Sequence, residues 1–178
     1  SKINFLNFYA RRFKRLVPAL ACCVTVTGIL SIFFTSPLGD GTYNNLLTGI
    51  GSLYGLSNII IDIKFGNYFD PDVKFNTFLN TWSLSIEEQF YLCFSAFLYF
   101  LIKSNLIKSI NSILIIVFFI SFLIFFIDYL DLTTSRYFSS LSGFYNPVSR
   151  AWELLVGVLS FLYVRKVFTK FNNRFVYF

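Results

Sequence analysis

Residues 110–127 read Ile110-Asn-Ser-Ile-Leu-Ile-Ile-Val-Phe-Phe-Ile-Ser-Phe-Leu-Ile-Phe-Phe-Ile127, and this stretch decides the fold class. Lys108 precedes it, Asp128 follows it, and no charged residue lies between them. A helix needs roughly 20 mostly apolar residues to cross the ~30 Å hydrocarbon layer of a bilayer. The sequence therefore predicts a membrane-spanning helix over residues 110–127.

Other apolar runs on both sides of this stretch have a comparable length, namely 16–35, 82–102 and 147–164. Asn146 and Pro147 suit the N-cap and the first position of the last of these helices. Pro18 lies near the predicted start of the first, where a missing N–H is tolerated. The sequence thus predicts an all-α fold, a polytopic transmembrane helical bundle with about four spanning helices.

Residues 43–63 form a weaker segment. It has the length of a span, but Gly49, Gly51, Gly55 and several polar side chains interrupt it. A fifth full span would also move a basic cluster to the outer side of the membrane, against the usual bias of Lys and Arg toward cytoplasmic loops. We therefore predict a re-entrant or interfacial helix here, buried against protein where its backbone polar groups are satisfied.

Composition supports a membrane protein and argues against a nucleic-acid partner. Charged residues make up 13% of the 178-residue chain and hydrophobic residues 56%, whereas soluble domains carry about 25% charged residues. The net charge of +6 is explained by the positive-inside bias. With four spans, the basic clusters at 11–15, 103–108 and 165–174 all lie in the cytoplasm, as do both ends of the chain, while the acidic residues lie outside. The predicted location is the inner (cytoplasmic) membrane, with several passes.

The chain lacks two residue types altogether. It contains no Met and no His, so we expect it to be a fragment whose parent protein supplies any histidine base. Cys22, Cys23 and Cys93 have no metal-type spacing, so no metal site is expected.

The first group of candidate functional residues is the basic cluster Arg11-Arg12-Phe-Lys-Arg15. Arg12 and Arg15 are three residues apart and share a helix face. Their guanidinium groups suit bidentate binding of a phosphate. The alternative is an ordinary anchor that binds anionic lipid headgroups.

The second group lies at the start of the 82–102 run and comprises Asn80, Trp82, Ser83, Glu87, Glu88 and Tyr91. On a helix, four of these residues fall along one stripe: Asn80, Ser83, Glu87 and Tyr91. Glu88 also fits a capping box with Ser85, which would give it a purely structural role. A carboxylate near a membrane boundary usually faces a partner or a watery cavity, which favours a functional role for Glu87.

The third group is Arg150-Ala-Trp152-Glu153, followed by Gly157. Arg150 and Glu153 are spaced for an i, i+3 ion pair, and Trp152 suits the membrane interface. Gly157 would let another helix approach closely. In the predicted topology Glu87 and the Arg150–Glu153 pair both lie at outer helix ends, so we expect them to line one cavity.

Five motifs, taken in order, resemble the membrane acyltransferase 3 family, whose members O-acetylate bacterial surface sugars. They are Phe8-Tyr-Ala-Arg-Arg-Phe-Lys-Arg-Leu-Val-Pro-Ala19, Ser57-Asn58, Gly66-Asn-Tyr-Phe-Asp70, Thr81-Trp-Ser-Leu-Ser-Ile-Glu-Glu-Gln-Phe-Tyr-Leu92 and Arg150-Ala-Trp-Glu-Leu-Leu-Val-Gly157. The ordered set is far more specific than any one of them.

The resemblance implies a ten-helix protein that passes an acyl group from cytoplasmic acyl-CoA, typically acetyl-CoA, to a hydroxyl of an envelope glycan such as lipopolysaccharide. Residues 1–178 match its third to sixth helices, and its essential histidine belongs to the first helix. Arg11, Arg12 and Arg15 match the family's donor-binding element, and Glu87 matches the acid of the Trp-Ser-Leu box. The family commonly has His where this chain has Asn80, so an acid–base role at that position is not expected.

The resulting mechanistic hypothesis is general-base acyl transfer with acyl-CoA as co-substrate and no bound cofactor. A histidine outside the chain activates the acceptor, Glu87 orients polar groups, and the arginines hold the donor. Asn80, Trp82, Ser83, Glu88, Tyr91, Arg150, Trp152 and Glu153 shape the cavity. The fragment alone is expected to be inactive. Two alternatives are a transporter or flippase with the same cavity, and a non-catalytic scaffold. In every case the arginines and carboxylates are expected at opposite faces of the bilayer.

Overall fold

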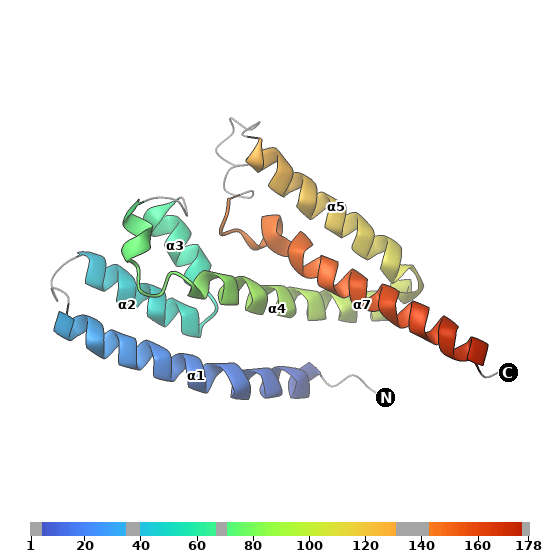
Figure 1. The fold of residues 1–178 in the computed structure, drawn as a ribbon, viewed down its shortest axis with the longest axis horizontal. Coiled ribbons are helices and arrows are strands. Elements are labelled where there is room, and N and C mark those ends of the chain that lie inside the picture. Colours follow the sequence, from blue (N-terminus) through green and yellow to red (C-terminus); the bar gives the residue numbers. More distant parts are fainter. Residues whose placement is uncertain (1–4, 35–39, 67–70, 131–142, 176–178) are drawn as a thin grey trace. The chain divides into compact units, whose positions relative to one another are not determined.

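The computed structural model describes residues 5–34, 40–66, 71–130 and 143–175, and every regular element within these ranges is a helix (Figure 1). The chain divides into two compact units. The first unit comprises residues 1–95 together with 144–146, and the second comprises 96–143 and 147–178. The predicted all-α polytopic helical bundle is confirmed, and each unit is described by itself below.

Helix α1 (Phe5–Phe34) begins well before the predicted span. The basic cluster therefore lies within the helix, not ahead of it. Pro18 lies inside α1, so the expectation that this proline marks the first turn is wrong. The upstream residues Phe5 to Phe8 are mostly apolar and belong to the helix, whereas the prediction started it only after the basic cluster.

Helices α2 (Asp40–Leu53) and α3 (Ser57–Phe65) form the weak segment predicted over residues 43–63. Gly55 breaks the helix with φ +67°, a conformation that glycine adopts without strain. The amides of Gly55 and Leu56 donate to the carbonyls of Ser52 and Gly51 and close the turn. A Cβ on Gly51 would lie 2.2 Å from Ile60 Cδ1, so α2 and α3 approach closely at this glycine. The segment thus forms two short helices joined by a tight turn where one helix was predicted, and its re-entrant or interfacial position stays a prediction.

The first unit also contains the short helix η1 (Pro71–Phe75) and the first part of α4 (Thr81–Lys103). Ile61, Val73 and Tyr145 form its apolar core, with Trp82 packed against them. Most of its buried residues are nevertheless small and polar: Ser31, Thr42, Asn45, Thr48, Ser52, Ser57, Asn58, Asn76 and Ser85. Many large apolar side chains are exposed instead, including Phe34 at 83% and Tyr54 at 76%. A polar interior with an apolar exterior is the arrangement expected in lipid.

The second unit is built on α5 (Ile110–Tyr129) packed along α7 (Pro147–Phe175), with η2 (Leu106–Ser109) leading into α5 (Figure 1). Helix α7 begins at Pro147, as predicted. Trp152 packs on Phe122 and Phe125 with ring centroids 5.4 and 5.6 Å apart. Ser121 Oγ accepts from the Trp152 amide at 2.9 Å and donates to the Val148 carbonyl at 2.6 Å. This hydroxyl from α5 thus bridges two backbone groups that ordinarily bond to each other within a helix.

Three helices in the described ranges are long and apolar enough to cross a membrane, namely Asn7–Phe34, Ile110–Tyr129 and Pro147–Lys166. Helix α4, which corresponds to the predicted span 82–102, is helical over that whole length. Its early turns carry Glu87, Glu88 and Gln89, and these polar residues lower its mean hydropathy, so it is not among the three.

Candidate functional site

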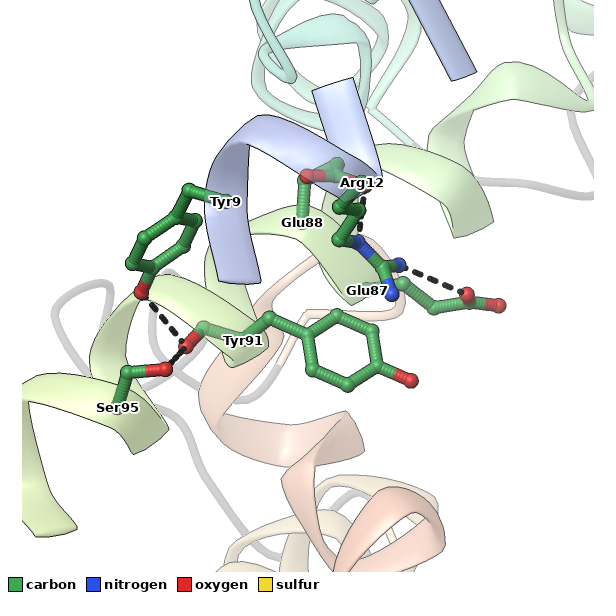
Figure 2. Close-up of polar contacts among 6 residues, drawn as sticks. All are labelled: Tyr9, Arg12, Glu87, Glu88, Tyr91 and Ser95. Atoms are coloured by element: carbon green, nitrogen blue, oxygen red, sulfur yellow. Dashed lines mark hydrogen bonds and ion pairs between the residues drawn. The ribbon is translucent and has the colours of Figure 1, made fainter. Parts of the chain in front are cut away.

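The polar centre of the first unit is Arg12 on α1, which meets the first turns of α4 (Figure 2). Arg12 Nε donates to Glu88 Oε1 at 2.8 Å, and Arg12 Nη2 lies 3.8 Å from Glu87 Oε2. The guanidinium also stacks on Tyr91, with Cζ 3.6 Å from the ring centroid. Arg12 is the most buried member of the ion-pair group, with 21% of its side chain exposed, against 35% for Glu88 and 45% for Glu87. Arg12 is therefore committed to partners within the chain.

A second contact between the same helices lies one turn away (Figure 2). Tyr9 Oη donates to the Tyr91 carbonyl at 3.2 Å, and this carbonyl also accepts from Ser95 Oγ at 2.8 Å. Moving from Arg12 back to Tyr9 on α1 thus corresponds to moving forward from Glu88 to Tyr91 on α4. The two helices run antiparallel at this contact, with their polar groups at one level.

This geometry corrects the expectation that the arginines and the carboxylates lie at opposite faces of the bilayer. Arg12 and Glu88 are hydrogen-bonded to each other, so they share one depth. The predicted topology assigned each loop to one side of the membrane from its charges, and it placed the basic cluster before the first helix. Because α1 begins at Phe5, Arg12 lies in the body of the helix and can pair sideways.

Two cavities flank Arg12. One, of about 460 Å³, is lined by Phe8, Arg11, Arg12, Arg15, Leu16, Leu84, Glu87 and Tyr91. The other, of about 640 Å³, is lined largely by apolar side chains from α1, α4 and the turn between α2 and α3, together with Lys14 and Glu88. Arg12, Leu16 and Leu84 line both cavities and form a shared wall. The smaller cavity, called the cationic cavity from here on, is lined by three arginines and one carboxylate and suits an anion. The larger cavity suits an uncharged, mainly apolar group.

Of the predicted stripe, only Glu87 and Tyr91 line the cationic cavity. Asn80 precedes α4, and its backbone carbonyl accepts a hydrogen bond from Ser83 Oγ at 3.2 Å. Both residues are exposed, and this contact is local to the start of the helix. Trp82 packs on Phe144 and Tyr145 with centroids 4.9 and 5.7 Å apart, which is a core role.

The capping alternative for Glu88 is wrong. Helix α4 begins at Thr81, so Ser85 lies inside it, buried and paired with Ser57 at 2.7 Å between the two Oγ atoms. Glu88 pairs with Arg12 and makes no capping contact with Ser85 in the described hydrogen bonds.

The third predicted group lies in the second unit. The Arg150–Glu153 ion pair is confirmed, and the Arg150 guanidinium lies 5.8 Å from the Phe125 ring centroid. The indole N–H of Trp152 is buried without a hydrogen-bond partner among the described residues. No described atom lies within 4 Å of a Cβ built on Gly157, so the expected close helix approach is not made by this part of the chain. Because these residues and Glu87 belong to different units, a shared cavity stays a prediction.

Two residues whose role was not predicted from the sequence, Asn58 and Gln89, lie next to the ion pair, because Gln89 directly follows Glu88 on α4. Asn58 on α3 and Gln89 on α4 exchange side-chain hydrogen bonds, Nδ2 to Oε1 at 3.3 Å and Nε2 to Oδ1 at 2.9 Å. Asn58 Nδ2 also donates to the Tyr145 carbonyl at 3.0 Å, and Gln89 Nε2 to the Gly55 carbonyl at 2.7 Å. The available signal was the occurrence of Asn58 and Gln89 inside the quoted motifs, but neither motif indicated that these two side chains meet.

No group of three or more His, Cys, Asp or Glu side chains suited to a metal occurs within the ranges that the structure describes. All three cysteines are exposed and free.

Known proteins resemble part of this chain. Peptidoglycan O-acetyltransferase OatA of Listeria monocytogenes is 35% identical over 101 residues, which cover 57% of this chain and 16% of that protein. O-acetyltransferase OatA of Staphylococcus aureus is 30% identical over 116 residues, covering 65% and 19%. This chain is a distant homologue of O-acetyltransferases.

An uncharacterised protein of Haemophilus influenzae is 32% identical to this chain over 122 residues, which cover 67% of the chain and 48% of that protein. The chain thus spans less than half the length of each of these relatives. No protein-family model matches it, and no solved structure matches it. The Listeria relative is named for peptidoglycan, whereas the sequence alone also pointed to lipopolysaccharide as an acceptor.

Proposed function

We propose that this chain is the central part of a membrane-bound acyltransferase 3 enzyme, which moves an acyl group, in the simplest case acetyl, from acyl-CoA to a hydroxyl of an envelope glycan. The observation that carries the proposal is the cationic cavity beside Arg12, in a chain distantly homologous to O-acetyltransferases. Peptidoglycan is the first acceptor to test, because it is the acceptor in the name of the Listeria relative.

The two adjoining cavities fit the two chemical parts of an acyl-CoA. Arg11 and Arg15 are exposed on α1 and line the cationic cavity, where guanidinium groups would bind the donor phosphates in a charge-assisted manner. The largely apolar neighbouring cavity would take the uncharged pantetheine arm and its acyl end. Arg12, already paired with Glu88, would act as the fixed wall between them.

The reaction itself is an ester exchange. The acceptor oxygen attacks the thioester carbonyl, a C–O bond forms and the C–S bond breaks. CoA leaves as a thiolate, which takes up the proton that the general base has removed from the acceptor hydroxyl. The proton of the acceptor hydroxyl passes to a general base, which we assign to a histidine outside this sequence because the chain contains none. A positioned base typically contributes about 10²–10⁴-fold. Glu87, which is half exposed in the cationic cavity, would orient polar groups of the bound substrates.

The test uses the full-length protein in membranes, with labelled acetyl-CoA and a peptidoglycan acceptor. Replacing both Arg11 and Arg15 by Ala should raise KM for the donor at least tenfold, since a hydrogen bond to a charged group contributes about 1.5–3 kcal/mol. Glu87→Gln should lower kcat, because the neutral amide is a weaker hydrogen-bond acceptor than the carboxylate. Lys103→Ala removes an exposed cation at the far end of α4 and is the matched control.

Each outcome has a distinct meaning. A double arginine variant with the wild-type KM would remove the donor site from this cavity. A wild-type protein that transfers no acyl group to any glycan would remove the enzymatic function. Movement of an unmodified glycolipid across the membrane by that protein would support the transport alternative.

A further inference from the structure

Asn58 and Gln89, called the amide pair below, join three separate parts of the first unit. Asn58 lies at the start of α3, Gln89 lies on α4, and their outer hydrogen bonds reach the Tyr145 and Gly55 carbonyls. Asn58 is fully buried. The amide pair therefore connects α3 and α4 to the backbone at Tyr145 and Gly55.

The N–H donors of the amide pair are all used inside the protein. Each amide group has two N–H donors, and all four are taken: two within the pair, one by Tyr145 and one by Gly55. Both side-chain carbonyls accept as well. No donor remains for a ligand, and neither residue lines either of the two cavities, so the amide pair does not contact a substrate bound there.

Its hydrogen bonds instead set the position of groups that line the site. Gln89 follows Glu88 directly on α4, and the carbonyl it holds belongs to Gly55, whose built Cβ would lie 3.5 Å from Glu88 Cβ. Gly55 also lines the larger cavity beside Glu88. The next contact along the same interface, Ser57 with Ser85, is also buried and hydrogen-bonded. Rotation of α4 about its axis would break these bonds before it could turn Glu88 away from Arg12.

We infer that Asn58 and Gln89 are positioning residues: they fix the rotation of α4 and the α2–α3 turn so that Glu87 and Glu88 meet Arg12 between the two cavities. The inference rests on the proposed function for its kinetic consequence, but its geometric content does not. Misplacement by about 1 Å through a residue remote from the chemistry can lower a rate about 100-fold. The amide pair therefore acts on turnover through Glu87, Glu88 and Arg12.

The kinetic test compares Gln89→Glu, Asn58→Asp and the exchanged double variant Asn58→Gln/Gln89→Asn in the full-length protein. Gln89→Glu removes the two donors that hold Gly55 and Asn58, and we expect kcat to fall at least tenfold with a smaller change in donor KM. The exchanged variant keeps both amides and the combined side-chain length, so it should recover most of that loss. Single variants that lower only the thermal unfolding temperature, with wild-type kcat in the folded fraction, would overturn the inference, as would an exchanged variant as slow as Gln89→Glu.

A cross-linking arm is independent of catalysis. Cysteines at Phe13 and Leu84, which line the same cavity from α1 and α4, are joined by a short bismaleimide in a background that lacks the native cysteines. We expect Gln89→Glu to lower the cross-linking yield severalfold and the exchanged variant to restore it. Equal yields in all variants would refute the positioning role even if the protein proves to be an acyltransferase. Changed yields in a protein without transferase activity would refute only the proposed function.

Discussion

The two units differ in how many polar side chains they bury. In the first unit most buried residues carry a hydroxyl or an amide, such as Thr48, Asn58 and Ser85. In the second unit the buried residues of the described ranges are three leucines and two serines, namely Leu101, Leu114, Leu155, Ser121 and Ser149, and aromatic rings of α5 stack along its length. Lipid tails are as apolar as leucine, so burial alone gives little drive for helices to associate in a membrane. Directional hydrogen bonds fix the first unit, and this is the unit that holds the two cavities.

The largest expected effect follows from removing the ion pair at the centre of the first unit. Arg12→Ala leaves Glu87 and Glu88 without their cation and should lower the free energy of unfolding by about 2–3 kcal/mol, less than the ~3–5 kcal/mol of a fully buried pair because Glu88 is partly exposed. Thermal unfolding in detergent measures the effect. In a double-mutant cycle, Arg12→Ala with Glu88→Ala should cost less than the sum of the single changes. If the free-energy costs of the two single changes were additive, the Arg12–Glu88 ion pair would not stabilise the first unit.

The next prediction exchanges the side-chain types of the two units. Asn58→Leu places an apolar residue in the polar interior and should destabilise by about 2 kcal/mol, because Gln89 and the Tyr145 carbonyl lose their partner. Leu114→Asn places an unpaired amide at a buried position of the second unit and should cost a similar ~2 kcal/mol. If Asn58→Leu stabilised the protein, the polar interior would be dispensable for folding and the comparison would fail.

Elements that depend on apolar runs or on local spacing were predictable from the sequence. The apolar run at 110–127 predicted the start of α5 to the residue, because a long charge-free stretch in lipid has few alternatives to a helix. Asn146 and Pro147 predicted the start of α7. The glycines and polar residues at 49–55 argued against a full span over residues 43–63, but one helix was predicted there and the break at Gly55 into α2 and α3 was not. The Arg150–Glu153 pair followed from i, i+3 spacing, which is a local rule.

The candidate site itself was beyond local rules. Arg12 and Glu88 are 76 positions apart, and the sequence placed them on opposite sides of the membrane by counting charges in loops. Counting assigns a side but no depth, so it could not detect a sideways pair. Asn58 and Gln89 were likewise recognisable only as parts of motifs, since which amide meets which depends on the rotation of two helices.

A smaller effect is expected where the second unit uses a single hydroxyl. Ser121→Ala removes the bridge between the Trp152 amide and the Val148 carbonyl. The two backbone groups can then bond to each other as in a regular helix, so the loss should be close to the ~0.6 kcal/mol typical of hydrogen bonds between membrane helices. A loss as large as that of Asn58→Leu would mean that polar contacts fix both units equally.

The smallest effect is expected at Gly157, which is exposed on α7 with open space around it. Gly157→Ala should stabilise slightly, by about 0.5 kcal/mol, because glycine inside a helix is unfavourable. Thermal unfolding of the full-length protein measures this change. Destabilisation instead would reveal a close neighbour on this face of the second unit.

The order of synthesis gives the pairing of Arg12 a consequence for biogenesis. Glu88 leaves the ribosome 76 residues after Arg12, so α1 meets the translocon before its counter-ion exists. Arg12 is the eighth of the 30 residues of α1, so its insertion without a counter-ion costs less than the ~2.5–3.5 kcal/mol of an arginine at a helix centre. This cost favours holding this part of α1 at the membrane surface. Helix α1 therefore reaches its final depth only after α4 has been translated, and a nascent chain stopped before residue 88 should leave Arg12 accessible to water-soluble reagents.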